Sequence, residues 1–435
     1  MAAPDSPGGT SASRPSLSPV ALTRDHQRYQ VISAVVVVSF LTILARVGIS
    51  GAKVEMAHDL NISDLTFGLV FGAFALGYAV FMVPCGLLAD RWGPRKSLAV
   101  SVFFWSLFTL CTGFASGVSA LIAIRFLFGL AEAGVFPQAT RALQNWTLPR
   151  QRGLALGLLN MGSRLGAALG LVATPPCVEW LGWRESFVLL GIIGAIWSAI
   201  WFLWFRDRPV ADSDAYDPDG PSPNISRPDA AYNFPWRAFL ASRNFYLIIV
   251  QYFTSQFTFF ICLSWLLPFS KSRYSVTNSA AGVYSSIPLC CGAIAMWIGG
   301  AVVDRMYKLG KWKLSRGLPA MLGLGLAAIT MLPAPFMPSL GWFIACFAVT
   351  IFGLDLTVSS SWTVCCDVGG EYSGTLSATM NTMGALGSFA SSLLFPILAG
   401  WAGNITLYFS LAALLNVVGL ICWKYIDPTK SLLHD

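Results

Sequence analysis

Long apolar stretches separated by short polar segments make up most of the chain from residue 31 onward. A helix that crosses a bilayer needs about 20 predominantly apolar residues. Stretches of that length occur at 31–52, 66–88, 97–117, 118–141, 153–174, 185–205, 243–266, 280–303, 317–337, 340–364, 372–398 and 404–424. Because lipid offers no partner for backbone N–H and C=O groups, each stretch should be helical. The pattern predicts an all-α membrane protein with twelve transmembrane helices.

Composition and charge agree with a bilayer as the surroundings. The chain is 55% hydrophobic and 11% charged, whereas a soluble domain carries about 25% charged residues. Of its 28 Lys and Arg, 21 fall on the side expected to hold both termini, four on the other side and three within helices. Such asymmetry follows the positive-inside rule and predicts cytoplasmic termini. It also explains the net charge of +7 without any nucleic-acid partner.

The chain is expected to divide into two six-helix halves. Its first residues are rich in Ala, Ser and Pro and lack the apolar core of a cleavable signal peptide. Six prolines occur from residue 209 to residue 235 and indicate a linker. The expected divisions are a disordered cytoplasmic tail (1–30), an N-terminal half (31–205), a cytoplasmic linker (206–242), a C-terminal half (243–425) and a cytoplasmic tail (426–435).

A glycine-rich, charged motif follows the second expected helix and recurs later in the chain. The first copy contains Gly86, Asp90, Arg91 and Gly93, and the second copy, 214 residues later, contains Gly300, Asp304 and Arg305. Glycine permits close helix approach and tight turns, while the charged groups suit a gating or structural role at the membrane surface. The motif resembles the loop signature of the major facilitator superfamily. Its recurrence indicates that one half repeats the other.

Two charges interrupt the apolar run from residue 118 to 136. Arg125 and Glu132 are seven residues apart, so they share one helix face, roughly 10 Å apart along the axis. A charge at this depth costs roughly 3 kcal/mol or more and normally faces a bundle interior or a water-filled cavity. The two residues are therefore candidates for a functional site, with a purely structural ion pair as the alternative.

Three further charges fall inside expected helices. Arg46 stands alone in the first helix, Arg164 lies in the fifth and Asp355 in the tenth. A planar guanidinium can bind a carboxylate through two hydrogen bonds, so Arg46 is a candidate anion ligand. Arg164 could be a second anion contact and Asp355 a second protonatable site. Both could instead be structural or reach water by snorkelling.

The pattern Arg125-Phe-x-x-Gly-x-x-Glu132-Ala-x-x-x-Pro resembles the anion:cation symporter family, which includes bacterial galactonate and hexuronate transporters, sialin and the vesicular glutamate transporters. The resemblance implies that Glu132 binds the coupled proton and that Arg125 is its partner or gate. It also implies that Arg46 holds the substrate carboxylate. The residues that would help Arg46 are Tyr78, Gln256, Ser359 and Asn381. One departure is Ala45, where the bacterial sugar-acid members carry Asp.

These observations predict a secondary transporter for a small organic anion, a sugar acid or other carboxylate, working by alternating access with proton symport. We expect a monomer in the bacterial inner membrane. A proton-coupled drug exporter and a non-transporting sensor of the same fold are the alternatives. The sequence lacks the Gly-x-Ser-x-Gly, His-Glu-x-x-His and phosphate-loop motifs of enzymes. Its three histidines lie in tails or loops and no Cys-x-x-Cys occurs, so neither a metal nor a cofactor is expected.

Overall fold

A computed structural model of the chain describes residues 19–147, 149–207, 236–369, 373–402 and 405–430, which form helices and no β-strand. The helices are α1 (Pro19–Asp59), α2 (Asp64–Gly113), α3 (Val118–Glu132), α4 (Val135–Trp146), α5 (Pro149–Leu181), α6 (Trp183–Trp204), α7 (Trp236–Ala241), α8 (Arg243–Ser264), α9 (Leu266–Tyr274), α10 (Asn278–Lys308), α11 (Trp312–Met331), the 3₁₀ turn η2 (Ala334–Phe336), α12 (Leu340–Gly369), α13 (Ser373–Ala402) and α14 (Thr406–Tyr425). The expected all-α class is confirmed.

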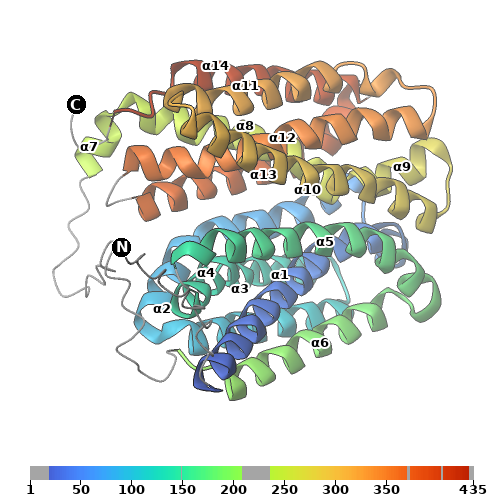
Figure 1. Cartoon of the computed structure of the whole chain (residues 1–435). Coiled ribbons are helices and arrows are strands. Elements are labelled where there is room, and N and C mark those ends of the chain that lie inside the picture. Colours follow the sequence, from blue (N-terminus) through green and yellow to red (C-terminus); the bar gives the residue numbers. More distant parts are fainter. Residues whose placement is uncertain (1–18, 148, 208–235, 370–372, 403–404, 431–435) are drawn as a thin grey trace, which may run out of the picture.

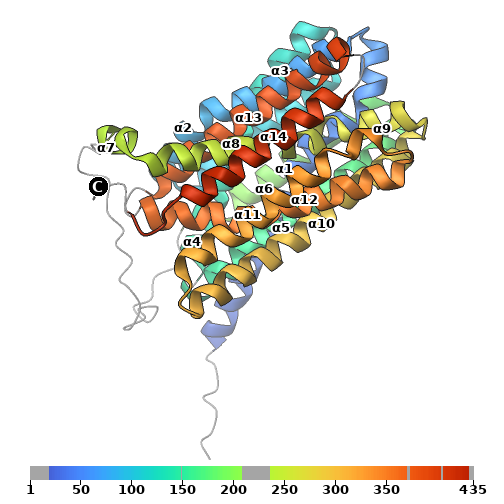
Figure 2. The ribbon, with the colours of Figure 1, turned by 90° about the horizontal axis from the view of Figure 1, so that it is seen from above.

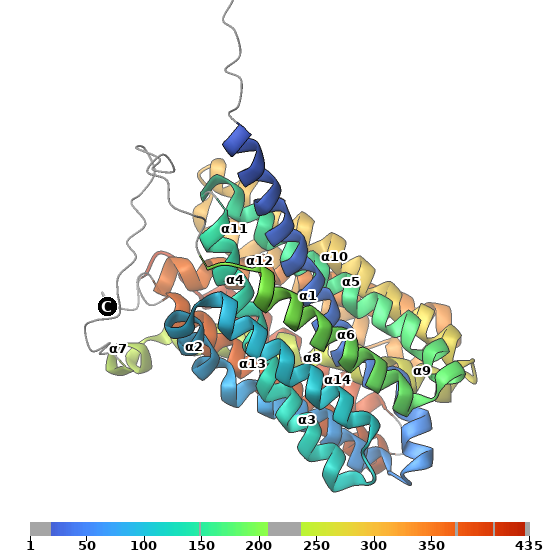
Figure 3. The ribbon, with the colours of Figure 1, turned by 90° about the horizontal axis from the view of Figure 1, so that it is seen from below.

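The helices gather in two groups that follow the order of the chain. In Figure 1, α1 to α6 form the lower group and α8 to α14 the upper group. Figure 2 shows the molecule from the side of the upper group, and Figure 3 from the side of the lower group. The two halves meet where α2 packs against α13 and where α5 packs against α10. Eleven segments of the described residues are long and apolar enough to cross a bilayer, and the 33-residue α5 is a further long helix.

Helix boundaries differ from the expected ones at the start of the chain and at residue 93. Because α1 begins at Pro19, residues 19–30 are helical rather than part of a disordered tail. The second and third expected helices join as α2 through a sharp turn at Gly93, whose φ of +72° favours glycine. Beyond this turn the Arg95 backbone N–H donates to Asp207 Oδ1 over 2.7 Å. The turn is thus tied to the first residues of the linker.

Proline interrupts the fourth and seventh expected helices. Pro137 has no N–H to donate to the Ala133 carbonyl, and the helix loosens at residues 133–134 into α3 and α4, directly after Glu132. In the same way, Pro268 cannot donate to the Ser264 carbonyl, and α8 gives way to α9 at Trp265. The expected helix 243–266 therefore continues, after this break, to Tyr274.

Glycines let neighbouring helices within the N-terminal half approach closely. A Cβ atom on Gly129 of α3 would lie 2.1 Å from the Phe74 carbonyl oxygen of α2, and one on Gly77 would lie 2.1 Å from the Phe126 carbonyl oxygen of α3. Small residues at such crossings are the usual means of packing membrane helices. This close contact sets the distance between the helices that carry Glu132 and Phe74.

Hydrogen bonds join the two halves at the end of the molecule where α9 lies. The Ser50 hydroxyl donates to the Ser264 carbonyl over 2.8 Å, using the oxygen that Pro268 leaves free. Lys271 Nζ and Asn278 Nδ2 both donate to Glu55 Oε1 over 3.2 Å. Polar contacts therefore hold the halves together at this end, at the right of Figure 1.

Polar contacts described at the opposite end stay within one half. Arg28 Nε donates to the Trp146 carbonyl over 3.2 Å in the N-terminal half. Arg316 Nε donates to Asp367 Oδ2 over 2.8 Å in the C-terminal half. Among the described residues, hydrogen bonds thus connect the two halves at the end where α9 lies, whereas those at the opposite end connect residues of the same half.

Several residues named above lie outside the described structure. The tail 1–18 and most of the linker, 208–235, are among them. The side chains of Asp90, Arg91 and Asp304 are also not described, and of Gly86 only its place in α2 is described. The gating or structural role expected for this motif stays a prediction. The end of the linker forms the short helix α7.

Candidate functional site

A cavity of about 170 Å³ lies between the two halves. Helices α1, α2, α4 and α5 line it from the N-terminal half, and α8, α10, α12 and α13 line it from the C-terminal half. Five of the seven residues expected to bind substrate line this one cavity: Arg46, Tyr78, Arg164, Gln256 and Asn381. Residues up to 335 positions apart in sequence, from Arg46 to Asn381, thus meet in one place.

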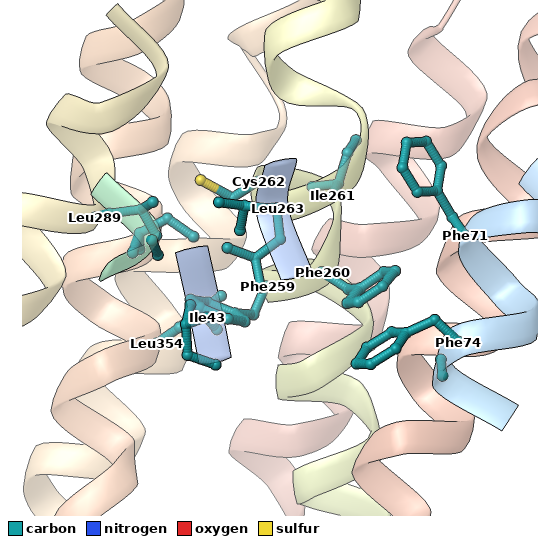
Figure 4. Close-up of a cluster of buried hydrophobic side chains, with 14 of the residues drawn as sticks. Ile43, Phe71, Phe74, Phe259, Phe260, Ile261, Cys262, Leu263, Leu289 and Leu354 are labelled. Carbon is teal, nitrogen blue, oxygen red and sulfur yellow. The ribbon is translucent and has the colours of Figure 1, made fainter. Parts of the chain in front are cut away.

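Aromatic side chains from both halves form much of the wall. Figure 4 shows Phe260 of α8 directed toward Phe74 of α2, while Phe259 points away from α2. All three line the cavity and belong to the buried apolar cluster. Apolar walls with a few polar groups are typical of small-molecule sites.

Arg46 forms an ion pair with Glu132. Both Nε, at 2.8 Å, and Nη2 of Arg46 donate to Glu132 Oε1. The guanidinium also lies over the rings of Phe74 and Tyr78, with 4.9 and 5.0 Å from Cζ to the ring centroids. The Arg46 side chain is 17% exposed and that of Glu132 is 0% exposed. The arginine therefore lines the cavity, with the carboxylate buried behind it.

A second ion pair of the same kind joins Arg164 of α5 to Asp355 of α12. It crosses between the halves. Arg164 Cζ also lies 4.4 Å from the ring centroid of Phe259 in α8. The Arg164 side chain is 14% exposed and that of Asp355 is 2% exposed. Both expected charges are thus paired, with Asp355 buried and Arg164 half-buried at the cavity.

Arg125 is arranged differently from its expected role as the partner of Glu132. It is 2% exposed, and in the described structure its charge forms no ion pair. Its Cζ lies 4.4 Å from the centroid of the Phe128 ring and 5.5 Å from that of Phe74, and its Nε has no hydrogen-bond partner. Arg125 precedes Glu132 by seven residues, about two helical turns along α3, which is farther than the usual spacing of an intrahelical ion pair. Arg46 of α1 lies closer to Glu132 and forms the ion pair instead.

Ser359 does not line the cavity, although it was expected to help bind substrate. Its hydroxyl faces α10, where a Cβ atom on Gly300 would lie 3.6 Å from Ser359 Oγ. The residues of α12 that line the cavity are Val358 and Trp362. A one-residue error in helix register rotates a side chain by about 100°, which accounts for the difference.

Other polar residues of the lining were not anticipated from the sequence. Asn160 and Ser163 precede Arg164 on α5, and Tyr252 precedes Gln256 on α8. Asn160 and Tyr252 are each four residues before an expected site residue, so they share its helix face. The spacing from Arg164 and Gln256 was the signal that could have identified them.

Outside the central cavity, the described residues form no second group of buried charges around a cavity and no metal-binding cluster. A hollow of about 560 Å³ beside the ends of α2 and α6 is lined by apolar residues such as Phe114, Leu189 and Ile192, together with Arg184 and Glu185. Among the described residues no three His, Cys, Asp or Glu side chains are grouped so as to hold a metal ion. The arginine-lined cavity is the candidate functional site.

Comparisons with known proteins identify the family. Residues 35–392 match the Major Facilitator Superfamily. The chain belongs to this superfamily. A probable sulfoacetate transporter from Cupriavidus necator is 30% identical over 414 residues, 93% of this chain and 95% of that protein. A probable L-galactonate transporter from Escherichia coli (24% over 402 residues, 89% and 88% covered) and a hexuronate transporter from Bacillus subtilis (28% over 385 residues, 86% and 87%) also match.

Solved structures of the superfamily agree on the fold. A bacterial homologue of the human lysosomal transporter Spinster, in an inward-facing and unoccupied conformation, superposes with a TM-score of 0.70 at 20% identity, covering 92% of this chain and 94% of that one. The predicted major facilitator fold is therefore confirmed, as is the expectation of a multi-pass membrane transporter rather than an enzyme. The resemblance to galactonate and hexuronate transporters is confirmed by the relatives found.

Proposed function

We propose that this chain is a secondary active transporter that moves a small organic anion across the membrane by alternating access, coupled to proton symport. The observation that carries the proposal is the cavity between the halves, into which Arg46 and Arg164 present their guanidinium groups. Counting Arg125, three arginines face two acids here, Glu132 and Asp355, so the surroundings carry a net positive charge. Such a field favours an anion over a cation.

Competition for one guanidinium gives a route to coupling. Glu132 uses Oε1 to accept both hydrogen bonds from Arg46, and its Oε2 has no partner. A substrate carboxylate that takes the donors of Arg46 deprives Glu132 of its counter-charge. An unpaired carboxylate in a buried position is costly, and taking up a proton relieves that cost. Substrate binding and protonation of Glu132 would then occur together.

Ala45 concentrates this role on Glu132. It is fully buried beside Arg46 and brings no carboxylate to the site, unlike the Asp of the bacterial sugar-acid members that the sequence resembles. Asp355 is engaged by Arg164 on the far side of the cavity. Glu132 is therefore the carboxylate best placed to carry the proton that accompanies an anion on Arg46.

The sealed end of the molecule suits one state of an alternating-access cycle. With the termini cytoplasmic, as the positive-inside rule indicates, the hydrogen bonds from Ser50, Lys271 and Asn278 close the outer side. The polar contacts described at the cytoplasmic end stay within one half, as expected for a state whose cytoplasmic side can open. A charge distribution of this kind suits the bacterial inner membrane, and the three relatives described above come from bacteria.

The relatives guide the choice of test compounds. Their names point to sulfoacetate, L-galactonate, hexuronates and galactarate or D-glucarate, all small and acidic. A cavity of about 170 Å³ is also smaller than the roughly 300–1,000 Å³ typical of sites for drug-sized ligands. Size and charge thus favour a small anion over the substrate of a drug exporter.

Uptake into proteoliposomes tests the proposal. The purified full-length chain should accumulate at least one of these anions when an inward proton gradient is imposed. Glu132→Gln should abolish gradient-driven accumulation while anion exchange persists. Accumulation by that variant equal to wild type would remove Glu132 from coupling. Binding of an anion without flux under any gradient would indicate a sensor instead.

A further inference from the structure

We infer that the substrate carries two separate acidic groups, one bound by Arg46 and the other by Arg164. This inference rests on the proposed function and narrows the substrate class to compact dianions. Two guanidinium groups line the same cavity, and they are contributed by α1 and α5. A monoanion needs only one of them.

The two arginines are built into equivalent units. In each unit the guanidinium keeps some exposure, 17% for Arg46 and 14% for Arg164, while the acid behind it is 0% or 2% exposed. In each unit one carboxylate oxygen is buried without a hydrogen-bond partner, Oε2 of Glu132 and Oδ2 of Asp355. Each acid holds its arginine in place, and each arginine is the group that an entering anion meets first.

The first unit lies within the N-terminal half, and the second unit bridges the two halves. The neighbours of Arg46 are Glu132, Phe74 and Tyr78, all in the N-terminal half. Arg164 starts from the same half, but its side chain lies against Phe259 and Asp355 in the C-terminal half. A ligand with an acidic group at each end would therefore bind Arg46 within the N-terminal half and, through Arg164, act on a contact between the two halves.

Charge balance supports the same class of ligand. Arg46, Arg125 and Arg164 against Glu132 and Asp355 leave one positive charge when both acids are ionised. A monoanion neutralises this site without any proton. A dianion leaves one negative charge, which one proton on Glu132 neutralises. A buried acid beside Arg46 is therefore useful to a carrier of dianions, because Glu132 can bind the proton that neutralises the extra negative charge.

The cavity has room for such a molecule. Its volume of about 170 Å³ suits a small molecule better than a drug-sized one. Aromatic side chains such as Phe74, Phe259 and Phe260 form the wall and suit the short carbon chain between two acidic groups. Tyr78 and Asn381 offer hydrogen bonds to substituents on that chain.

Matched pairs of ligands test the inference. The probes are sulfoacetate, succinate and glucarate, each beside the analogue in which one acidic group is replaced by an amide. Binding is measured by the ligand-dependent thermal shift of the purified full chain. We expect at least one diacid to bind ten-fold or more tightly than its amide, which corresponds to about 1.4 kcal/mol. Equal affinities within every pair would overturn the inference, although the proposed anion transport would stand.

Variants of Arg164 and Asp355 test whether Arg164 causes the tighter binding of a diacid than of its amide analogue. Arg164→Gln alone leaves Asp355 buried and unpaired, so the informative variant is the double change Arg164→Gln with Asp355→Asn, which removes both charges together. This double variant should reduce the preference to less than about three-fold. Asp355→Asn alone keeps the guanidinium and should keep the preference. A full preference in the double variant would overturn the assignment of Arg164. If no acid of either kind binds to wild type, the proposed function fails as well.

Discussion

The ion pair of Arg46 and Glu132 predicts unequal losses of stability when either partner is removed. Arg46→Ala leaves Glu132 at 0% exposure with neither of its carboxylate oxygens paired. Glu132→Gln leaves Arg46 at 17% exposure beside the cavity, still over the rings of Phe74 and Tyr78 and still able to donate to the amide oxygen. The arginine variant should therefore be the less stable of the two.

Typical energies set the size of the difference. Breaking a buried ion pair from one side costs about 3–5 kcal/mol, which we expect for Arg46→Ala. Exchanging a charged acceptor for a neutral one costs about 1 kcal/mol when the hydrogen bond survives, which we expect for Glu132→Gln. The double variant removes the unpaired charge and should recover most of the larger loss, giving a coupling of several kcal/mol.

Unfolding of the purified protein in detergent measures these losses, with the midpoint of thermal or denaturant-induced unfolding as the readout. Lys313→Ala is the matched control, because its ion pair with Asp427 lies at the surface, with the Lys313 side chain 63% exposed. Such pairs contribute less than about 1 kcal/mol. Equal losses for Arg46→Ala and Glu132→Gln, or no recovery in the double variant, would refute the view that Glu132 is a buried charge held by Arg46.

Three further predictions concern packing, the sealed end and pH. Gly129→Ala should push α3 away from α2 and lower expression and thermal stability, because its Cβ would lie 2.1 Å from the Phe74 carbonyl oxygen. Gly129→Val should have the larger effect, because it adds two methyl groups at the same contact. Glu55→Gln should weaken the contact with Lys271, which hydrogen exchange would detect as faster exchange at the end of α1. A hydrogen bond from Thr429 holds the pKa of Asp427 below its usual value. Asp427→Asn should therefore destabilise the protein slightly above about pH 4, and its difference from wild type in pH-dependent melting should vanish at lower pH.

Much of the fold could be predicted from the sequence because one physical requirement dominates it. A helix in lipid must be apolar over about 20 residues, so the long helices stand out by composition alone. The breaks were not predicted. Pro137 lies inside an apolar run that reads as continuous, and Pro268 follows the run 243–266 by two residues. The effect of each proline depends on which neighbouring group hydrogen-bonds to the carbonyl that it leaves free. For Ser264 that neighbour is the hydroxyl of Ser50 in the other half.

The site was predicted as a set of residues more readily than as a set of pairs. Buried charges are conspicuous in an apolar run, so Arg46, Glu132, Arg164 and Asp355 could all be identified. Which arginine pairs with which acid depends on how distant helices pack together. Arg46 and Glu132 are 86 residues apart in sequence, and Arg164 and Asp355 are 191 residues apart. The family resemblance implied Arg125 as the partner or gate of Glu132. The tertiary structure instead brings Arg46 to it.

The position of Arg125 makes that exchange of partners informative. Arg125 is buried over Phe128, and its charge stays unpaired in the described structure. A second positive charge on the same helix as Glu132 favours the ionised carboxylate whenever Arg46 turns to substrate. Glu132 then takes up a proton only if the free-energy cost of burying its ionised carboxylate exceeds the electrostatic stabilisation that Arg125 gives to that carboxylate. Arg125→Met would remove that attraction, so proton uptake on anion binding should persist to higher pH in this variant. An unchanged pH dependence would mean that Arg125 stabilises α3 without tuning the proton.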